Sequence, residues 1–225
     1  MGDEAAEHHT FLFADMAGFT ALTEVMGDEE AVTVAEGFFG SAREILDEHG
    51  AREVKTIGDA LMIHISDAAP AVRLGLRLAG EIGGRHGFPS VRVGMHSGPA
   101  VRRGEDWFGA TVNLAARVSG AAAGGEVLVT NATRAAAGEL GDVDLLEHGR
   151  RRFRNVGEPV LLFRALAVAG RHELEDLPID PVCRMAVDPA RQAGLLIHDG
   201  VEYRFCSLDC AQRFAAEPER FAQPA

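Results

Sequence analysis

Two aspartates, Asp15 and Asp59, stand where they could hold a metal ion. Asp15 closes the apolar run 11–14, which is typical of a buried strand, and Gly18 indicates a turn just beyond it. Asp59 follows Gly58 between two β-prone runs, and a Gly-X pair suits a two-residue hairpin. Hard divalent cations prefer carboxylate oxygens and leave other positions to water and phosphate. The pair therefore predicts a magnesium site, while ordinary turn aspartates are the alternative.

A second polar pair, Asn113 and Arg117, lies four residues apart in a segment expected to form a helix, about 111–119. Residues at this spacing share one helix face, so a phosphate or ribose bound there would contact an amide and a guanidinium together. The alternative is an ordinary solvated helix face.

Lys55 is the only lysine among the 22 lysine and arginine residues of the chain. A lysine presents one compact ammonium group as a donor, which a planar guanidinium cannot do. This singles out Lys55 as a candidate ligand-binding residue, although compositional drift toward arginine would leave the same pattern.

The hydrophobic pattern predicts the elements that must position these residues. Strands are expected at 11–15, 54–57, 60–65 and 91–95, with helices from 28 to about 50 and over 72–82. This βαββαβ order favours a ferredoxin-like α+β core with two helices on one face of a sheet. Beyond the helix near 111–119, further strands are expected at 127–129 and 160–166.

Length and charge limit the classes of function. At 225 residues, one full domain with a small additional module is the natural division. A net charge of −12 opposes sequence-independent binding to nucleic acid or anionic membranes. An apolar run such as 160–163 is far too short to span a bilayer, and the first residues lack the features of a secretion signal. We therefore expect a cytoplasmic protein without nucleic-acid or membrane partners.

Four motifs support a more specific interpretation. They are FADMAGFT at 13–20, KTIGD at 55–59, VGMHSG at 93–98 and FGATVNLAAR at 108–117. In this order and spacing, the stretch from about 11 to 166 resembles the catalytic domain of the class III adenylate and guanylate cyclases.

The resemblance implies a homodimer in which two domains pair head to tail and share each active site. Asp15 and Asp59 then resemble the aspartates that hold two Mg²⁺ or Mn²⁺ ions. Asn113 resembles the residue that orients the ribose. Arg117 resembles the residue that stabilises charge on the α-phosphoryl group, and both come from the partner chain.

Lys55 and Asp106 match the pair that reads the base in this family. A lysine donates to N1 of adenine and an aspartate accepts from its 6-amino group, whereas guanine would leave both mispaired. ATP is therefore the expected substrate, with cyclic AMP and pyrophosphate as products. Arg154 is assigned to the triphosphate, where many members carry another basic residue. Pro99 replaces an arginine found in some mammalian domains.

The three cysteines, Cys183, Cys206 and Cys210, all lie near the C-terminus. Together with DPVCRMAVD at 180–188 and YRFCS at 203–207, they resemble the YHS domain, which is related to heavy-metal-associated three-cysteine modules. Three thiolates suit Zn²⁺ or Cu⁺, and His198 is a candidate for a fourth ligand. The alternative is three cysteines packed as small hydrophobic side chains.

The expected organisation is a cyclase domain at 8–168, a linker at 169–179 and a YHS domain at 180–223. The leading hypothesis is an adenylate cyclase in signal transduction that is regulated by metal at the C-terminal module. A catalytically silent nucleotide- or metal-binding regulator that uses the cyclase fold for dimerisation is the rival. A diguanylate cyclase or polymerase palm shares the core topology, but the chain has no GGDEF string.

Overall fold

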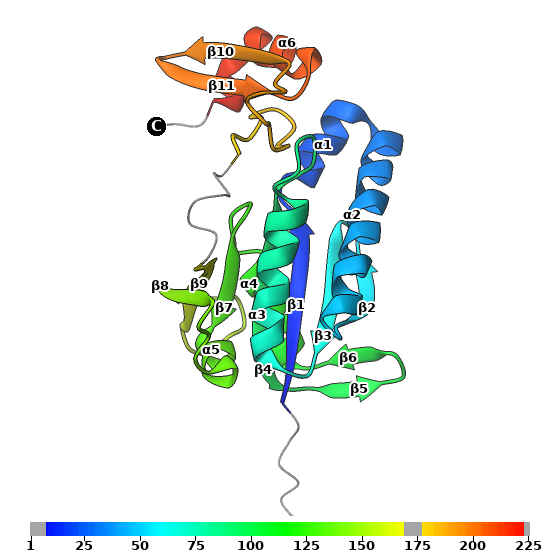
Figure 1. Ribbon diagram of the computed structural model, residues 1–225, viewed down its shortest axis with the longest axis vertical. Coiled ribbons are helices and arrows are strands. Elements are labelled where there is room, and N and C mark those ends of the chain that lie inside the picture. Colours follow the sequence, from blue (N-terminus) through cyan, green and yellow to red (C-terminus); the bar gives the residue numbers. More distant parts are fainter. Residues whose placement is uncertain (1–7, 169–176, 223–225) are drawn as a thin grey trace, which may run out of the picture.

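The computed structural model describes residues 8–168 and 177–222, and within them the chain has an α+β fold (Figure 1). The elements of the larger unit are β1 (His8–Met16), α1 (Phe19–Met26), α2 (Asp28–Glu48), β2 (Arg52–Ile57), β3 (Ala60–Ile65), α3 (Ala68–Arg77), the π-helical turn η1 (Leu78–Ile82), β4 (Val91–Pro99), β5 (Val101–Arg103), β6 (Asp106–Phe108), α4 (Ala110–Ser119), β7 (Val127–Thr130), α5 (Asn131–Ala137), β8 (Val143–Arg151) and β9 (Val160–Ala167). The C-terminal unit contains β10 (Gly194–His198), β11 (Val201–Phe205), α6 (Leu208–Ala216) and α7 (Pro218–Phe221).

A seven-stranded sheet in the described part of the chain has the order β2-β3-β1-β4-β7-β9-β8. Its first four strands have the ferredoxin-like order, which confirms the predicted βαββαβ core. The β1 strand lies at the centre of that core, antiparallel to β3 on one side and to β4 on the other. The β4 and β7 strands pair in parallel.

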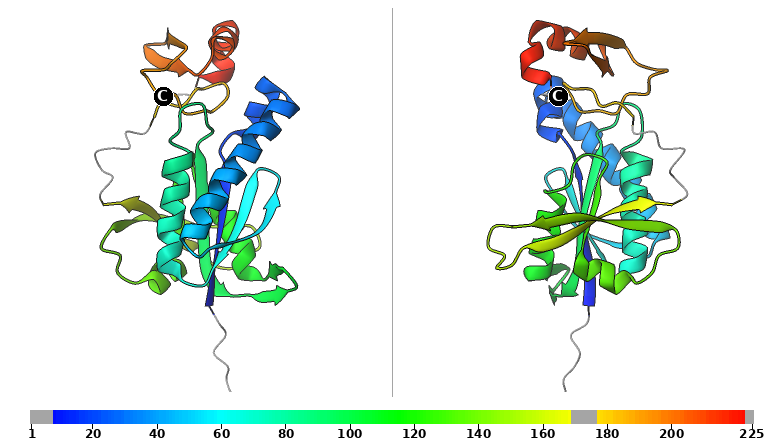
Figure 2. Two further views of the ribbon diagram at one scale, coloured as in Figure 1. Left: turned by 45° about the vertical axis from the view of Figure 1, so that its right-hand side comes forward. Right: turned by 90° about the vertical axis from the view of Figure 1, so that its left-hand side faces the viewer.

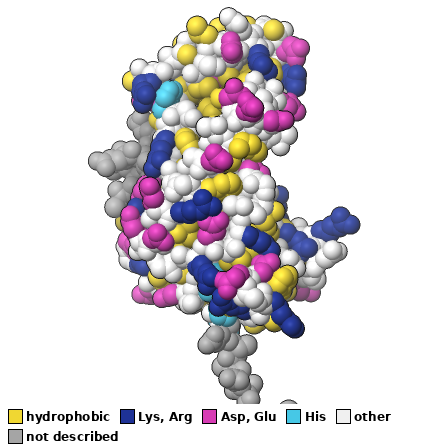
Figure 3. Space-filling view, turned by 90° about the vertical axis from the view of Figure 1, so that its right-hand side faces the viewer, with side chains coloured by type: hydrophobic (Ala, Val, Ile, Leu, Met, Phe, Trp, Pro, Cys, Tyr) yellow, Lys and Arg dark blue, Asp and Glu magenta, His cyan; other side chains and the backbone are white. Residues whose placement is uncertain are grey.

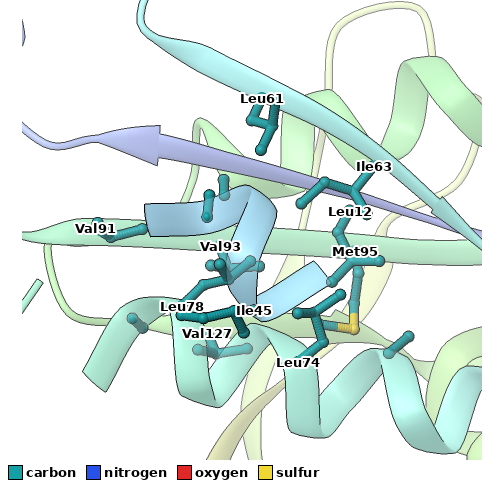
Figure 4. Close-up of a cluster of buried hydrophobic side chains, with 14 of the residues drawn as sticks. Leu12, Ile45, Leu61, Ile63, Leu74, Leu78, Val91, Val93, Met95 and Val127 are labelled. Carbon is teal, nitrogen blue, oxygen red and sulfur yellow. The ribbon is translucent and has the colours of Figure 1, made fainter. Parts of the chain in front are cut away.

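The two faces of the sheet bury alternate residues of β1, because successive side chains of a strand point to opposite sides. Leu12 packs with Ile63, Met95 and Leu74 in the core beneath α2 and α3 (Figure 4). Phe11 packs on the other face, against residues of α4 such as Val112. The sheet is therefore covered on both faces, and the ends of its strands are left to carry polar groups.

Helix α2 follows directly from its sequence. Its first turn carries Asp28, Glu29 and Glu30, which favour the positive end of the helix dipole. Its buried residues are Ala31, Ala35, Phe38, Ala42, Ile45 and Leu46, at helical spacing. The hairpin between β2 and β3 turns at Gly58, whose φ of 61° suits glycine, and this places Asp59 at the tip.

Several elements lie outside the sequence expectations. The β5–β6 hairpin, α5 and the long edge strand β8 were not predicted, and the second helix changes to π geometry at η1. Most of the expected linker, residues 169–176, lies outside the described residues. Among the helices of the described ranges, none combines the length and the hydrophobicity that a membrane span requires.

Helix α1 lies at one end of the sheet, and the C-terminal unit lies beyond that same end in all the ribbon views (Figures 1 and 2). Its β10–β11 hairpin packs on α6 through Phe205 and Phe214, whose ring centroids lie 5.3 Å apart. Both signs of charge are interspersed over the face of the molecule in Figure 3.

Candidate active site and thiol cluster

Asp15 and Asp59 lie side by side at one end of the sheet. Asp15 pairs with Ala60 in the β1–β3 register, so the hairpin tip brings the neighbouring Asp59 to the same place. Partial burial, together with hydrogen bonding and repulsion from the Asp15 carboxyl group, raises the pKa of Asp59 to about 6. Two adjacent carboxylates are a donor set that fits hard divalent cations.

Arg92 is a residue of this site that the sequence analysis missed. It lies opposite Asp15 in the β1–β4 register, and its Nε donates to Asp15 Oδ2 at 2.8 Å. A second hydrogen bond joins Nη2 to the same oxygen. The available signal was its position directly before the VGMHSG motif, on the face of β4 opposite to the buried Val91 and Val93.

Lys55 and Asp106 come together from different parts of the chain. Lys55 Nζ lies 2.5 Å from Asp106 Oδ2, and both side chains stay partly exposed. The hydrogen bond from Lys55 and a second one from the backbone N–H of Trp107 lower the pKa of Asp106. The pair thus presents an ammonium and a carboxylate toward solvent, as a polar ligand requires.

Asn113 and Arg117 lie on the side of α4 that faces away from the sheet, since Val112, Ala115 and Val118 are its buried residues. Among the described residues, no hydrogen bond or ion pair joins Asn113 or Arg117 to the two aspartates. Arg154 is exposed in the turn after β8, and no described ion pair engages its guanidinium. The structure therefore assembles two of the predicted pairs within one chain and leaves these three residues apart.

The three cysteines gather in the C-terminal unit, together with Asp180. One ligand atom from each of the four residues lies within 4.8 Å of all the others, and Cys183 Sγ is 3.3 Å from Cys206 Sγ. His198 is not a member of this group. The described structure thus supplies a carboxylate, where the sequence suggested an imidazole.

Asp180 holds the cluster in place. It is fully buried, and its carboxylate accepts hydrogen bonds from the backbone N–H groups of Val182 at 2.9 Å and Cys206 at 2.8 Å. These bonds join the turn that carries Cys183 to the end of β11. Asp180 was missed as a candidate because the signal, an aspartate three residues before a cysteine, is common in turns.

The thiols differ in their electrostatic environment. Hydrogen bonds from Cys183 and Cys206 lower the pKa of Cys210. Its position in the first turn of α6 also favours a thiolate, since Ser207 caps that helix. The donor set of three sulfurs and one carboxylate, largely buried, fits a four-coordinate Zn²⁺, whose ligands lie about 2.0–2.3 Å from the metal.

The chain matches two family models. The first, described as the Adenylate and Guanylate cyclase catalytic domain, matches residues 2–150, and the YHS domain model matches residues 179–225. Since the first match covers most of the chain, the protein belongs to the adenylate and guanylate cyclase catalytic domain family. It carries a YHS domain at its C-terminus.

Relatives with curated names agree with this assignment. The chain is 40% identical over 169 residues to the "pH-sensitive adenylate cyclase MT1302" of Mycobacterium tuberculosis, covering 74% of this chain and 42% of the relative. It is 38% identical over 120 residues to an adenylate cyclase of Streptomyces coelicolor, covering 53% of this chain and 32% of the relative. The chain therefore spans less than half the length of these relatives.

Solved structures support the fold. An adenylate cyclase from Trypanosoma brucei, solved in its monomeric state, superposes with a TM-score of 0.67 at 23% identity, covering 76% of this chain and 92% of that one. The adenylyl cyclase CyaB from P. aeruginosa superposes with a TM-score of 0.61 at 20% identity, covering 71% and 93%.

Proposed function

We propose that this protein is an adenylate cyclase that converts ATP to 3′,5′-cyclic AMP and pyrophosphate. The observation that carries the proposal is the adjacency of Asp15 and Asp59 at one end of the sheet, with the pKa of Asp59 raised to about 6. Two carboxylates held this close favour a bound cation, because a cation removes the repulsion that their joint ionisation creates. The curated relatives named adenylate cyclase support the same activity.

The proposed reaction joins the ribose 3′-oxygen to the α-phosphorus. As that bond forms in line, the bond from the α-phosphorus to pyrophosphate breaks, and the 3′-hydroxyl proton leaves to solvent. Asp15 and Asp59 would hold Mg²⁺ or Mn²⁺, two ions per site. When bound, these ions lower the pKa of the 3′-hydroxyl and neutralise triphosphate charge. Arg117 stabilises the charge on the α-phosphoryl group and Asn113 orients the ribose.

We propose that the working unit is a homodimer with shared sites. Asn113 and Arg117 face away from the sheet of their own chain, and no described contact joins them to Asp15 or Asp59. A second copy would bring its own Asn113 and Arg117 to the aspartates. Arg154, exposed after β8, would contact the triphosphate.

ATP is the proposed nucleotide because of the Lys55–Asp106 pair. Lys55 offers a donor to N1 of adenine, and Asp106 offers an acceptor to the 6-amino group. Guanine presents a donor at N1 and an acceptor at O6, so both contacts would be mispaired.

Product analysis of the purified chain tests the proposal. The protein is incubated with ATP or GTP and Mg²⁺ or Mn²⁺, beside Asp59→Ala and the matched control Asp47→Ala, an exposed aspartate on α2. Cyclic AMP from the wild type and Asp47→Ala, but not from Asp59→Ala, is the expected result. A stable dimer that forms no cyclic nucleotide under any condition would favour the rival function, a catalytically silent scaffold.

We also propose that the C-terminal module binds a thiophilic metal, Zn²⁺ or Cu⁺, through Cys183, Cys206, Cys210 and Asp180. The supporting observation is the four ligand atoms that lie within 4.8 Å of one another. Metal content by mass spectrometry is expected to fall in Cys206→Ser and to stay unchanged in His198→Asn, which lies outside the cluster. Equal metal content in wild type and Cys206→Ser would instead support cysteines that act only in packing.

A further inference from the structure

The C-terminal module packs directly on the helix that follows Asp15. Leu22 of α1 is fully buried, and it belongs to the same apolar cluster as Val182, Met185 and Phe214 of the module. The partly buried Phe19 and Val25 flank the same cluster. Burial of an apolar side chain stabilises the arrangement that covers it, so the position of α1 depends on the docked module.

Backbone hydrogen bonds extend this contact to the loop before β4. The N–H of Ala186 donates to the carbonyl of Phe88 at 2.9 Å, and the N–H of Gly87 donates to the carbonyl of Ala186 at 3.0 Å. Two residues further along that loop, the carbonyl of Ser90 accepts from the N–H of Ala17 at 2.8 Å. One short loop thus binds both the module and the turn that follows Asp15.

A further close approach brings Arg184 to Gly18. A β-carbon placed on Gly18 would lie 2.5 Å from Cγ and 2.6 Å from Cβ of Arg184, so the methylene stem of Arg184 fills the space that glycine leaves. Gly18 is the N-cap of α1, with a φ of 86°, and it follows Asp15 by three residues. Arg184 is bonded directly to Cys183, so a shift of the backbone at Cys183 would also move the residue that covers Gly18.

We infer that the thiol cluster and the nucleotide site are linked, with Arg184 as the positioning residue between them. The inference rests on the proposed metal binding of the module and the proposed nucleotide binding at Asp15 and Asp59. Both ligand sets are assembled in the same conformation of the chain, with the module docked. A ligand at either site therefore stabilises the arrangement that the other site needs, and the coupling is positive.

Thermodynamic reciprocity makes this linkage measurable without catalysis. If Zn²⁺ tightens nucleotide binding by some factor, the nucleotide must tighten Zn²⁺ binding by the same factor. The full chain is titrated with Zn²⁺ against a chromophoric chelator, with and without saturating Mg²⁺ and 3′-deoxy-ATP, which lacks the attacking hydroxyl. The reciprocal titration measures 3′-deoxy-ATP affinity with and without Zn²⁺, at concentrations where sedimentation shows one assembly state. We expect each ligand to bind at least about 5-fold more tightly when the other is present.

Two substitutions at Arg184 test the contact with Gly18 without disrupting the turn that carries Arg184. Arg184→Gly removes the stem over Gly18, and glycine tolerates the φ of 66° at this position, so the turn is retained. Arg184→Lys keeps Cβ, Cγ and Cδ. Arg184→Gly is expected to bring the coupling factor close to one at unchanged Zn²⁺ stoichiometry, whereas Arg184→Lys keeps the factor of the wild type.

The outcomes distinguish the linkage from the functions on which it rests. A coupling factor of one or less between Zn²⁺ and nucleotide binding in the wild type overturns the linkage, even when Zn²⁺ binds and cyclic AMP is formed. If Arg184→Gly has the same coupling factor as the wild type, Arg184 is not the positioning residue between the two sites. If the wild type does not bind Zn²⁺, the proposed metal site is wrong and the linkage fails with it. Product analysis tests the cyclase activity independently.

Discussion

Lys55 Nζ and Asp106 Oδ2 lie 2.5 Å apart, although the two residues are separated by 51 positions in the chain. Lys55 comes from β2 and Asp106 from β6, so the pair exists only because the β5–β6 hairpin lies beside the edge of the sheet. Each side chain has spare hydrogen-bonding capacity, since lysine carries three donors and a carboxylate about four acceptor positions. The pair can therefore bind a base edge without being broken.

Replacing either member of this pair is expected to reduce the selection of ATP over GTP. A hydrogen bond to a charged group contributes about 1.5–3 kcal/mol, so Lys55→Ala and Asp106→Ala should each lower kcat/KM for ATP about 10- to 100-fold. Rates with both nucleotides measure the effect. The free energy of unfolding of both variants should stay close to that of the wild type, because the ion pair is partly exposed.

Arg43→Ala is the matched control for this experiment. Arg43 makes a comparable exposed ion pair with Glu53 of β2, at 2.6 Å, and no role in nucleotide binding is proposed for it. Its selectivity for ATP should equal that of the wild type. A selectivity in Lys55→Ala that equals the Arg43→Ala value would remove Lys55 from base recognition.

Mixing two variants that are each expected to be inactive tests the proposed shared site. Asp59→Ala lacks a proposed metal ligand, and Arg117→Ala lacks the side chain expected to cross to the partner. In a heterodimer of the two, one site contains both defects and the other contains neither. Random exchange makes half of the dimers mixed, so the mixture should regain about a quarter of the wild-type activity. A mixture that exchanges subunits and stays inactive would contradict the shared site.

The core of the fold could be predicted from the sequence because its elements carry strong local patterns. The apolar run 11–14, the helical repeat from Ala31 to Ile45 and the Gly58 turn each depend on neighbours in the sequence. The edge strand β8 was missed for the opposite reason. Only Val143 is buried in it, and a register shift between Glu147 and Gly149 breaks its alternation.

The site residues that could not be predicted depend on contacts between residues that are far apart in the sequence. Arg92 reaches Asp15 only through the β1–β4 register, and Asp180 joins the cysteines only because its turn meets the end of β11. The contact of Arg184 with Gly18 has the same origin. A local pattern identifies which residue types are present, but it does not show which distant backbone they face.

Gly18→Ala is expected to destabilise the protein through two separate effects. An alanine at a φ of 86° costs about 1–2 kcal/mol from backbone strain alone, and its β-carbon would meet Arg184 Cγ at 2.5 Å. The double variant Gly18→Ala with Arg184→Gly removes the steric part and keeps the strain. Urea unfolding should therefore rank wild type above the double variant, and the double variant above Gly18→Ala. If the double variant and Gly18→Ala are equally stable, the side chain of Arg184 does not clash with a β-carbon at position 18.

His96 provides a prediction on pH. It lies on β4, where burial lowers its pKa to about 4 and its Nδ1 is 2.7 Å from Thr130 Oγ1. In the unfolded chain a histidine titrates near pH 6.5, so between about pH 6.5 and 4 the unfolded state binds more protons than the folded state. The stabilisation from a neutral His96 is therefore complete above pH 6.5 and is lost as the pH falls toward 4.

His96→Gln should flatten this part of the stability profile, because glutamine does not titrate. Across the full window the difference in slope integrates to at most about 3 kcal/mol, since one pKa unit corresponds to about 1.4 kcal/mol. Urea unfolding at intervals from pH 7 to pH 4, for wild type and His96→Gln, measures the two slopes. His64, whose pKa burial also lowers to about 4, remains in both proteins and leaves a residual acid slope. Parallel profiles would show that His96 is not desolvated in the folded protein, whereas a shallower slope in the variant confirms that burial makes this strand sensitive to acid.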